Sequence, residues 1–87
     1  MPTTWREQLV NEMKAFGETW DDMVYHTMTD EQLDKPFYDS YGGTNGDPFT
    51  LWTHNRVYFP ACYDGAEWIA SVPRHPVQIA TPHVGGG

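Results

Sequence analysis

The segment RVYFPACYDGAEWIASV, residues 56–72, decides the fold of this chain. Two runs rich in β-branched and aromatic residues flank Asp64-Gly65, a dipeptide typical of a two-residue hairpin turn. The segment therefore predicts two antiparallel strands over residues 56–63 and 66–72. Pro60 lacks the N–H that a central strand donates, so we expect a β-bulge at that position.

A third strand is expected immediately before this hairpin. Residues 49–53 are again β-rich, and His54-Asn55 would form a two-residue turn into the next strand. Residues 39–48 carry a dense set of turn formers and predict a loop. Together these patterns predict a three-stranded antiparallel meander.

The N-terminal half has a helical pattern. A capping-box spacing of Thr4 and Glu7 predicts the start of a helix over residues 4–26. Gly17 either lies inside this helix or ends a first piece, with a second piece continuing roughly in line, and we favour the break. Six apolar residues recur at the helical period: Trp5, Leu9, Met13, Phe16, Trp20 and Met23.

A second, short helix is expected over residues 30–35. Thr29 has capping-box spacing to Gln32, and Pro36 prevents the helix from continuing. The fold class is therefore α+β, with N-terminal helices packed on the three-stranded meander. We expect one domain over residues 1–72 and a Pro/Gly-rich extended tail over residues 73–87, because 87 residues support a single core.

The negative charge of the chain is localised. Ten of the twelve acids precede Leu51, against three basic residues there, and the net charge is −7. Such a surface repels nucleic acid and attracts basic protein surfaces, so we expect a protein partner with a basic surface and no direct nucleic-acid binding. The candidate partner-binding residues are the acids and two tyrosines of this half: Glu7, Glu18, Asp21, Asp22, Asp30, Glu31, Asp34, Tyr38, Asp39, Tyr41 and Asp47.

The sequence lacks the motifs of an enzyme or a metal protein. No nucleophile motif surrounds Cys62, the single cysteine, which we expect to be buried in a strand. The four histidines show no i, i+4 pair, and the acids do not match an EF-hand loop. We therefore expect no catalysis, metal or cofactor. With no long apolar run and no signal peptide, the expected location is the cytoplasm.

Several stretches resemble small uncharacterised accessory proteins of tailed bacteriophages. The resemblance is carried by WDD at residues 20–22, YGG at 41–43, PFTLWT at 48–53, RVYFP at 56–60 and YDGAEW at 63–68. It covers most of the chain and brings no activity or functional residue with it. It implies an accessory phage protein that acts in the cytoplasm of the host cell.

The leading hypothesis is a phage-type protein that binds a host protein through its acidic face and inhibits or modulates it. In its sharpest form the carboxylates mimic nucleic-acid phosphates in an anti-defence role. An acidic face also serves solubility alone. The alternatives are a small-ligand-binding module, with Trp52, Tyr58 and Trp68 lining a pocket between sheet and helices, and a minor virion structural protein that self-assembles. The oligomeric state stays open.

Overall fold

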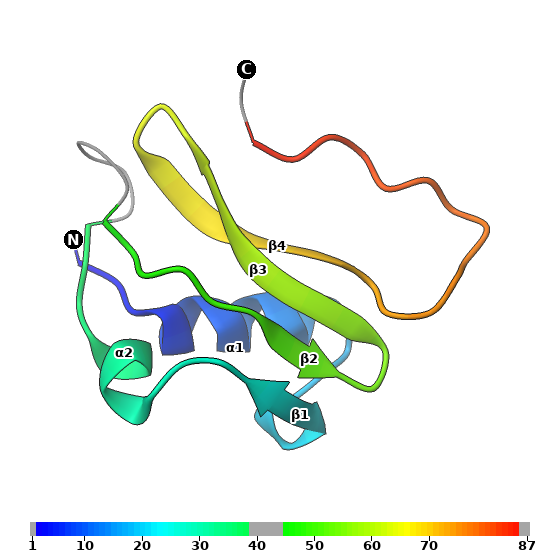
Figure 1. Cartoon of the computed structure of the whole chain (residues 1–87), viewed down its shortest axis with the longest axis horizontal. Coiled ribbons are helices and arrows are strands. Elements are labelled where there is room, and N and C mark those ends of the chain that lie inside the picture. Colours follow the sequence, from blue (N-terminus) through cyan, green and yellow to red (C-terminus); the bar gives the residue numbers. More distant parts are fainter. Residues whose placement is uncertain (1, 39–44, 86–87) are drawn as a thin grey trace.

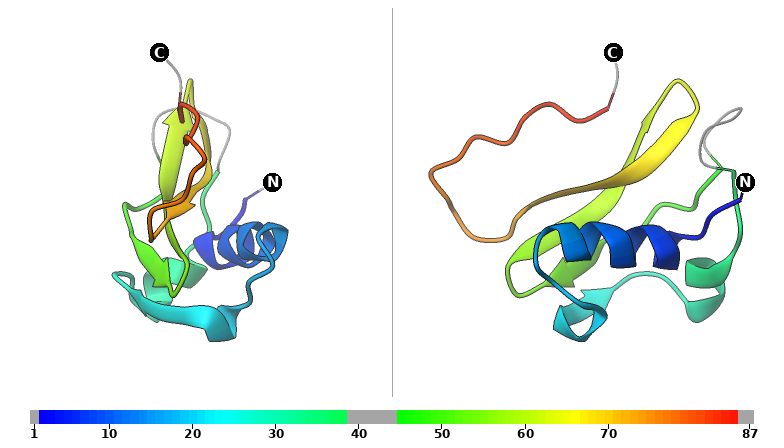
Figure 2. Two further views of the ribbon diagram at one scale, coloured as in Figure 1. Left: turned by 90° about the vertical axis from the view of Figure 1, so that its right-hand side faces the viewer. Right: turned by 180° about the vertical axis from the view of Figure 1, so that it is seen from behind.

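A computed structural model describes residues 2–38 and 45–85 of the chain, and it shows an α+β fold (Figure 1). The strands form one four-stranded antiparallel sheet in the order β1-β2-β3-β4. Helix α1 lies against one face of this sheet (Figure 2). The elements are α1 (Trp5–Ala15), a 3-10 turn (Trp20–Asp22), β1 (Met23–His26), α2 (Asp30–Asp34), β2 (Leu51–Thr53), β3 (Arg56–Tyr63) and β4 (Ala66–Pro73).

The predicted hairpin is confirmed. Strands β3 and β4 pair in continuous register from Arg56 opposite Pro73 to Tyr63 opposite Ala66. Asp64 and Gly65 both have positive φ angles, 49° and 85°. These are the angles of a type I′ turn, whose twist matches that of the flanking strands.

The predicted bulge at Pro60 is wrong, because the register across it is unbroken. Tyr63 and Ala66 flank a two-residue turn and so form a hydrogen-bonded pair, and alternation makes Pro60 and Ile69 a non-hydrogen-bonded pair. The ring nitrogen of Pro60 therefore faces away from β4. On that side β2 pairs with Val57 and Tyr58 but does not extend to Pro60. The missing donor therefore costs the sheet no hydrogen bond.

The chain after α1 forms a strand instead of a second helical piece. The predicted break is confirmed, since α1 ends at Ala15 and Gly17 has φ of 74°, a left-handed conformation that suits glycine. The in-line continuation to residue 26 is wrong. Residues 23–26 form β1, which pairs with β2 and makes the sheet four-stranded. Val24 and Tyr25 are good strand formers, and the edge of β2 offers them backbone partners.

The hydrophobic core lies between α1, α2 and the sheet. Trp5 is its largest member and packs against Phe37 and Phe49, with ring centroids 4.6 and 5.1 Å away. The predicted apolar face of the helix is confirmed for its first three residues, whereas Phe16 is 46% exposed. The core comprises Trp5, Leu9, Met13, Met28, Leu33, Phe37, Phe49, Leu51, Tyr58 and Ile69.

Residues 74–85 contain no helix or strand and run back along the β3–β4 hairpin to Gly85, which lies near the carbonyl of Cys62 in β3 (Figure 1). The start of this tail is held firmly. The backbone N–H of Arg74 donates to the carbonyl of Asn55 at 2.8 Å, and its Nη1 donates to the carbonyl of Thr53 at 2.9 Å. Further along, Val77 and Ile79 are 54% and 79% exposed. Neither α1 nor α2, the helices of the described ranges, is long and apolar enough to cross a membrane.

Candidate functional site

Six exposed carboxylates lie on α1, the 3-10 turn and α2, and we call them the acidic surface. Arg6 of α1 contacts two of them, and its Nε donates to Asp34 Oδ1 at 2.7 Å and its Nη2 to Asp34 Oδ2 at 3.2 Å. The same guanidinium lies 5.2 Å from the ring centre of Trp20 and 3.9 Å from Asp30 Oδ1. Arg6 therefore links three elements. The acidic surface consists of Glu7, Asp21, Asp22, Asp30, Glu31 and Asp34.

Part of the acidic surface also serves the local structure. Asp22 Oδ2 accepts the backbone N–H of Thr19 at 2.8 Å, which caps the 3-10 turn. Asp30 and Glu31 lie in the first turn of α2, where negative charge favours the helix dipole. The hydrogen bond from Arg6 lowers the pKa of Asp34. The carboxylates of Asp21 and Glu31 have no ion pair or hydrogen bond within the described ranges and remain open to a partner.

Glu18 does not belong to this surface. It is only 7% exposed, and its Oε1 accepts a hydrogen bond of 2.5 Å from the hydroxyl of Tyr58, which is fully buried. The expected exposure of Glu18 is therefore wrong. The break at Gly17 turns the chain toward the sheet and carries Glu18 inward. Burial, with a further contribution from the hydrogen bond to Glu18, holds the pKa of Tyr58 well above its ordinary value.

Glu67 is a second buried carboxylate, 4% exposed, which the sequence analysis missed. Its Oε1 and Oε2 accept the backbone N–H groups of Gly46 and Asn45, both at 2.8 Å. It therefore fixes the chain that enters β2. The alternation of side chains along a strand could have predicted this burial, since Glu67 lies on the same face of its strand as the core residue Ile69.

The remaining candidates of the loop are dispersed. Tyr38 is exposed, whereas Asp47 is half-buried, with its Oδ2 3.8 Å from Lys35 Nζ and its carbonyl accepting the indole N–H of Trp5 at 2.9 Å. Asp39 and Tyr41 lie outside the described residues. The structure thus brings Asp30 and Asp34 together at Arg6, and it gives Asp47 mainly a structural role.

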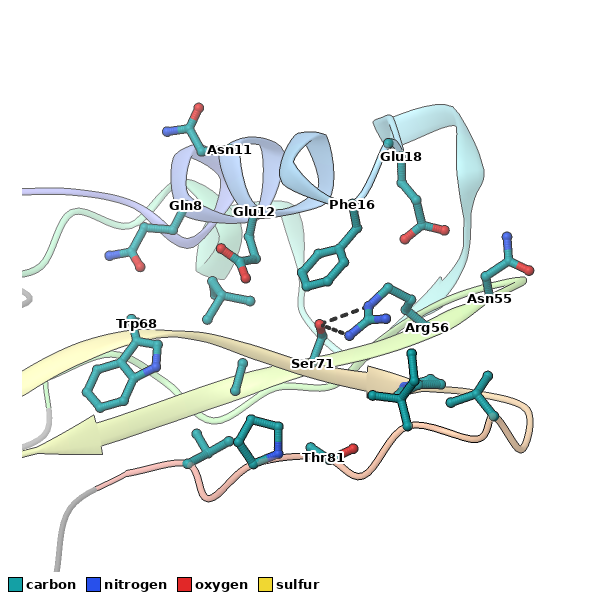
Figure 3. Close-up of a pocket in the computed structure, with 18 of the residues that line it drawn as sticks. Gln8, Asn11, Glu12, Phe16, Glu18, Asn55, Arg56, Trp68, Ser71 and Thr81 are labelled. Carbon is teal, nitrogen blue, oxygen red and sulfur yellow. Dashed lines mark hydrogen bonds between the residues drawn. The ribbon is translucent and has the colours of Figure 1, made fainter.

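A cleft of about 1280 Å³ lies between α1, β4 and the tail (Figure 3). On its floor the guanidinium carbon of Arg56 lies 3.8 Å from the ring centre of Phe16. Nε and Nη2 of Arg56 donate to Ser71 Oγ at 3.0 and 2.8 Å. Three carboxylates line the cleft against this one guanidinium: Glu12, Glu18 and Asp22. The cleft is therefore predominantly acidic.

The pocket expected between sheet and helices is not formed by the three aromatic residues named for it. Tyr58 is fully buried beneath α1. Trp52 pairs with Val57 and lies 5.8 Å from the ring of Tyr25, on the opposite face of the sheet. Trp68 lines the cleft and points away from α1 (Figure 3). The three side chains therefore do not share a cavity.

Cys62 is exposed, in contrast to the expected buried thiol. It lies near the turn end of the β3–β4 hairpin, beyond the part of β3 that packs on the core. Within residues 2–38 and 45–85, no three histidine, cysteine or acidic side chains come together in a way that would hold a metal ion.

No protein-family model matches this chain, and no curated protein or solved structure matches it either. The resemblance to accessory proteins of tailed bacteriophages therefore stays a prediction.

Proposed function

We propose that this chain is a small acidic phage-type protein that binds a host protein and inhibits or modulates it without catalysing a reaction. The observation that carries the proposal is the set of six exposed carboxylates on three elements that Arg6 links through its contacts with Asp34, Asp30 and Trp20. Lys35 lies beside Glu31, so six negative charges and the two positive charges of Arg6 and Lys35 leave a net charge of −4 on this surface.

The partner class follows from this charge. Carboxylates on one side of a short helical surface approximate the dense negative charge of nucleic-acid phosphates. A basic groove that binds nucleic acid would attract this surface, both in the encounter and in the complex. The proposed partner is therefore a nucleic-acid-binding protein of the host cytoplasm. Nucleic acid itself would be repelled by the same charge.

The test is an affinity pull-down from host lysate at low and high salt, followed by measurement of the affinity for the recovered partner. Asp21→Asn and Glu31→Gln are each expected to weaken binding roughly two- to five-fold, the range of one exposed ion pair. The matched control is Asp64→Asn, which removes one charge at the hairpin turn, where Asn suits the positive φ. A partner retained at high salt, with equal affinities for all three variants, would contradict the proposal.

The acidic cleft favours a second candidate function, the binding of a small cationic ligand between α1, β4 and the tail. Such a ligand would raise the melting temperature of the isolated protein, and the rise would grow with the logarithm of its concentration above Kd. A thermal-shift screen with cationic metabolites distinguishes the two functions. A ligand-binding protein would be stabilised by one of the metabolites, whereas a protein that only binds a host protein would not.

A further inference from the structure

Within residues 2–38 and 45–85, strand β4 ends the sheet, so one of its two edges has no neighbouring strand. In a β-sheet such an edge offers a row of unpaired N–H and C=O groups to an additional strand. Since Tyr63 and Ala66 form the hydrogen-bonded pair next to the turn, alternation along β4 directs the backbone groups of Glu67, Ile69 and Ser71 outward. These three residues define the open edge.

The tail passes this edge without pairing with it. Gly85, near the end of the tail, lies by the carbonyl of Cys62 in β3, and among the described residues no hydrogen bond joins residues 74–85 to β4 (Figure 1). The cleft occupies the space between them and is lined on one side by residues 68–71 and on the other by tail residues that include Val77, Ile79 and Val84. The open edge therefore faces an accessible cleft.

The two sides of the open edge differ in chemistry. The side chains of Ile69 and Ser71 point toward α1, where Gln8, Asn11 and Glu12 line the cleft (Figure 3). On the opposite side the half-buried ring of Trp68 presents apolar surface. An added strand alternates its side chains between the same two sides. Its residues toward α1 would meet the carboxylate of Glu12 between two amide side chains, and its other residues would meet the ring of Trp68.

We propose that the partner of this protein inserts an extended segment into the cleft as a fifth strand on β4, with basic residues alternating with apolar ones. Main-chain hydrogen bonds to the open edge provide affinity, and the two sides of the cleft provide specificity. The charge complementarity comes from Glu12 and Asp22, the accessible carboxylates of the cleft, since Glu18 is buried against Tyr58. This inference rests on the proposed function, since it names the part of a basic partner that is recognised.

The first experiment uses the full chain and synthetic peptides of seven residues in which lysine alternates with valine. Binding is measured by fluorescence anisotropy. Two further peptides carry N-methyl groups, either on all lysine amides or on all valine amides. In an antiparallel addition the lysines that face α1 also direct their N–H groups to β4. Methylation of the lysine amides should therefore abolish binding, whereas methylation of the valine amides should leave it within about two-fold.

Three variants separate the cleft from the acidic surface. Glu12→Gln should weaken peptide binding by about three-fold or more, whereas the matched change Asp64→Asn should not alter it. Glu31→Gln tests the other possibility, that the peptide merely binds the acidic surface. A loss with Glu31→Gln and none with Glu12→Gln would overturn the inference about the open edge while leaving the proposed function intact.

Amide hydrogen exchange gives an independent measurement. The amides of Ile69 and Ser71 should exchange rapidly in the isolated protein and become protected when the peptide binds. Protection in the isolated protein would mean that the tail already occupies the open edge and would overturn the inference. Equal losses for the two methylated peptides, or binding with no new protection, would overturn it as well.

Discussion

The hydroxyl of Tyr58 donates a 2.5 Å hydrogen bond to the carboxylate of Glu18, and both side chains are buried. The bond joins the middle of β3 to the segment just after Gly17, forty positions earlier in the chain. It therefore fixes where the chain leaves α1 to form β1, the strand that completes the sheet.

Removal of this hydroxyl should destabilise the protein. Tyr58→Phe leaves the buried Glu18 carboxylate without its hydrogen-bond donor. A buried acceptor without a donor lowers the free energy of unfolding by about 1–3 kcal/mol or more. Urea denaturation followed by circular dichroism measures the loss. The control Glu18→Gln keeps an acceptor for the hydroxyl and should cost less. A Tyr58→Phe variant as stable as the native chain would show that the bond contributes nothing net.

The same pair predicts the alkaline limit of stability. The pKa of Tyr58 is higher in the folded than in the unfolded chain, chiefly because of burial. Stability from the neutral phenol is thus fully present below the unfolded pKa of about 10 and is lost as the pH rises through the folded pKa. We expect the free energy of unfolding to fall above about pH 10 in the native chain, and less steeply in Tyr58→Phe. Equal slopes for both would contradict this assignment.

The Arg6–Asp34 pair predicts a smaller effect at low pH. Because the hydrogen bond from Arg6 lowers the folded pKa of Asp34, its contribution is present above the unfolded pKa of about 3.9 and is lost as the pH falls through the folded pKa. Asp34→Asn should flatten the decrease in stability below about pH 4. Both side chains are substantially exposed, so screening keeps the effect small, and high salt should reduce it further. A slope unchanged by the variant would argue against the pair.

Gly46→Ala should destabilise the core. A β-carbon at Gly46 would lie 2.4 Å from Cζ2 of Trp5 and 3.0 Å from Oε1 of Glu67, which holds the Gly46 amide. The Trp5 ring is fully packed, so the strain should cost about 1–3 kcal/mol of unfolding free energy. Thermal denaturation measures it. At Gly17 a β-carbon meets open space, and Gly17→Ala should cost only its left-handed strain, about 1–2 kcal/mol. A smaller loss for Gly46→Ala would mean that Trp5 can move aside.

The parts of the fold that were predicted correctly depend on neighbours in sequence. The turn at Asp64-Gly65, the cap of α2 by Thr29 and the break at Gly17 each follow from the backbone preferences of a few residues. The extension of the helix to residue 26 failed because Trp20 and Met23 are apolar for another reason. They pack against the core from a turn and a strand.

The candidate site was predictable in its composition but only partly in its geometry. The exposed acids of α2 follow from the capping pattern and the helix dipole, which operate within one turn. That Arg6 links α2 to the 3-10 turn required the packing of α1 on both. The open edge of β4 could not be predicted either, since it depends on which strand ends the sheet.

By itself the sequence determined the α+β class, the β3–β4 hairpin, the starts of the two helices and the localised negative charge, because each depends on local preference or on composition. Only the tertiary structure decided that β1 joins the sheet and that Glu18 and Glu67 turn inward. Glu18 accepts a hydrogen bond from Tyr58, and Glu67 accepts hydrogen bonds from the backbone of residues 45 and 46. The physical reason is that a strand and a buried carboxylate both need partners distant in sequence. Whether such partners exist at the right place is a property of the folded chain.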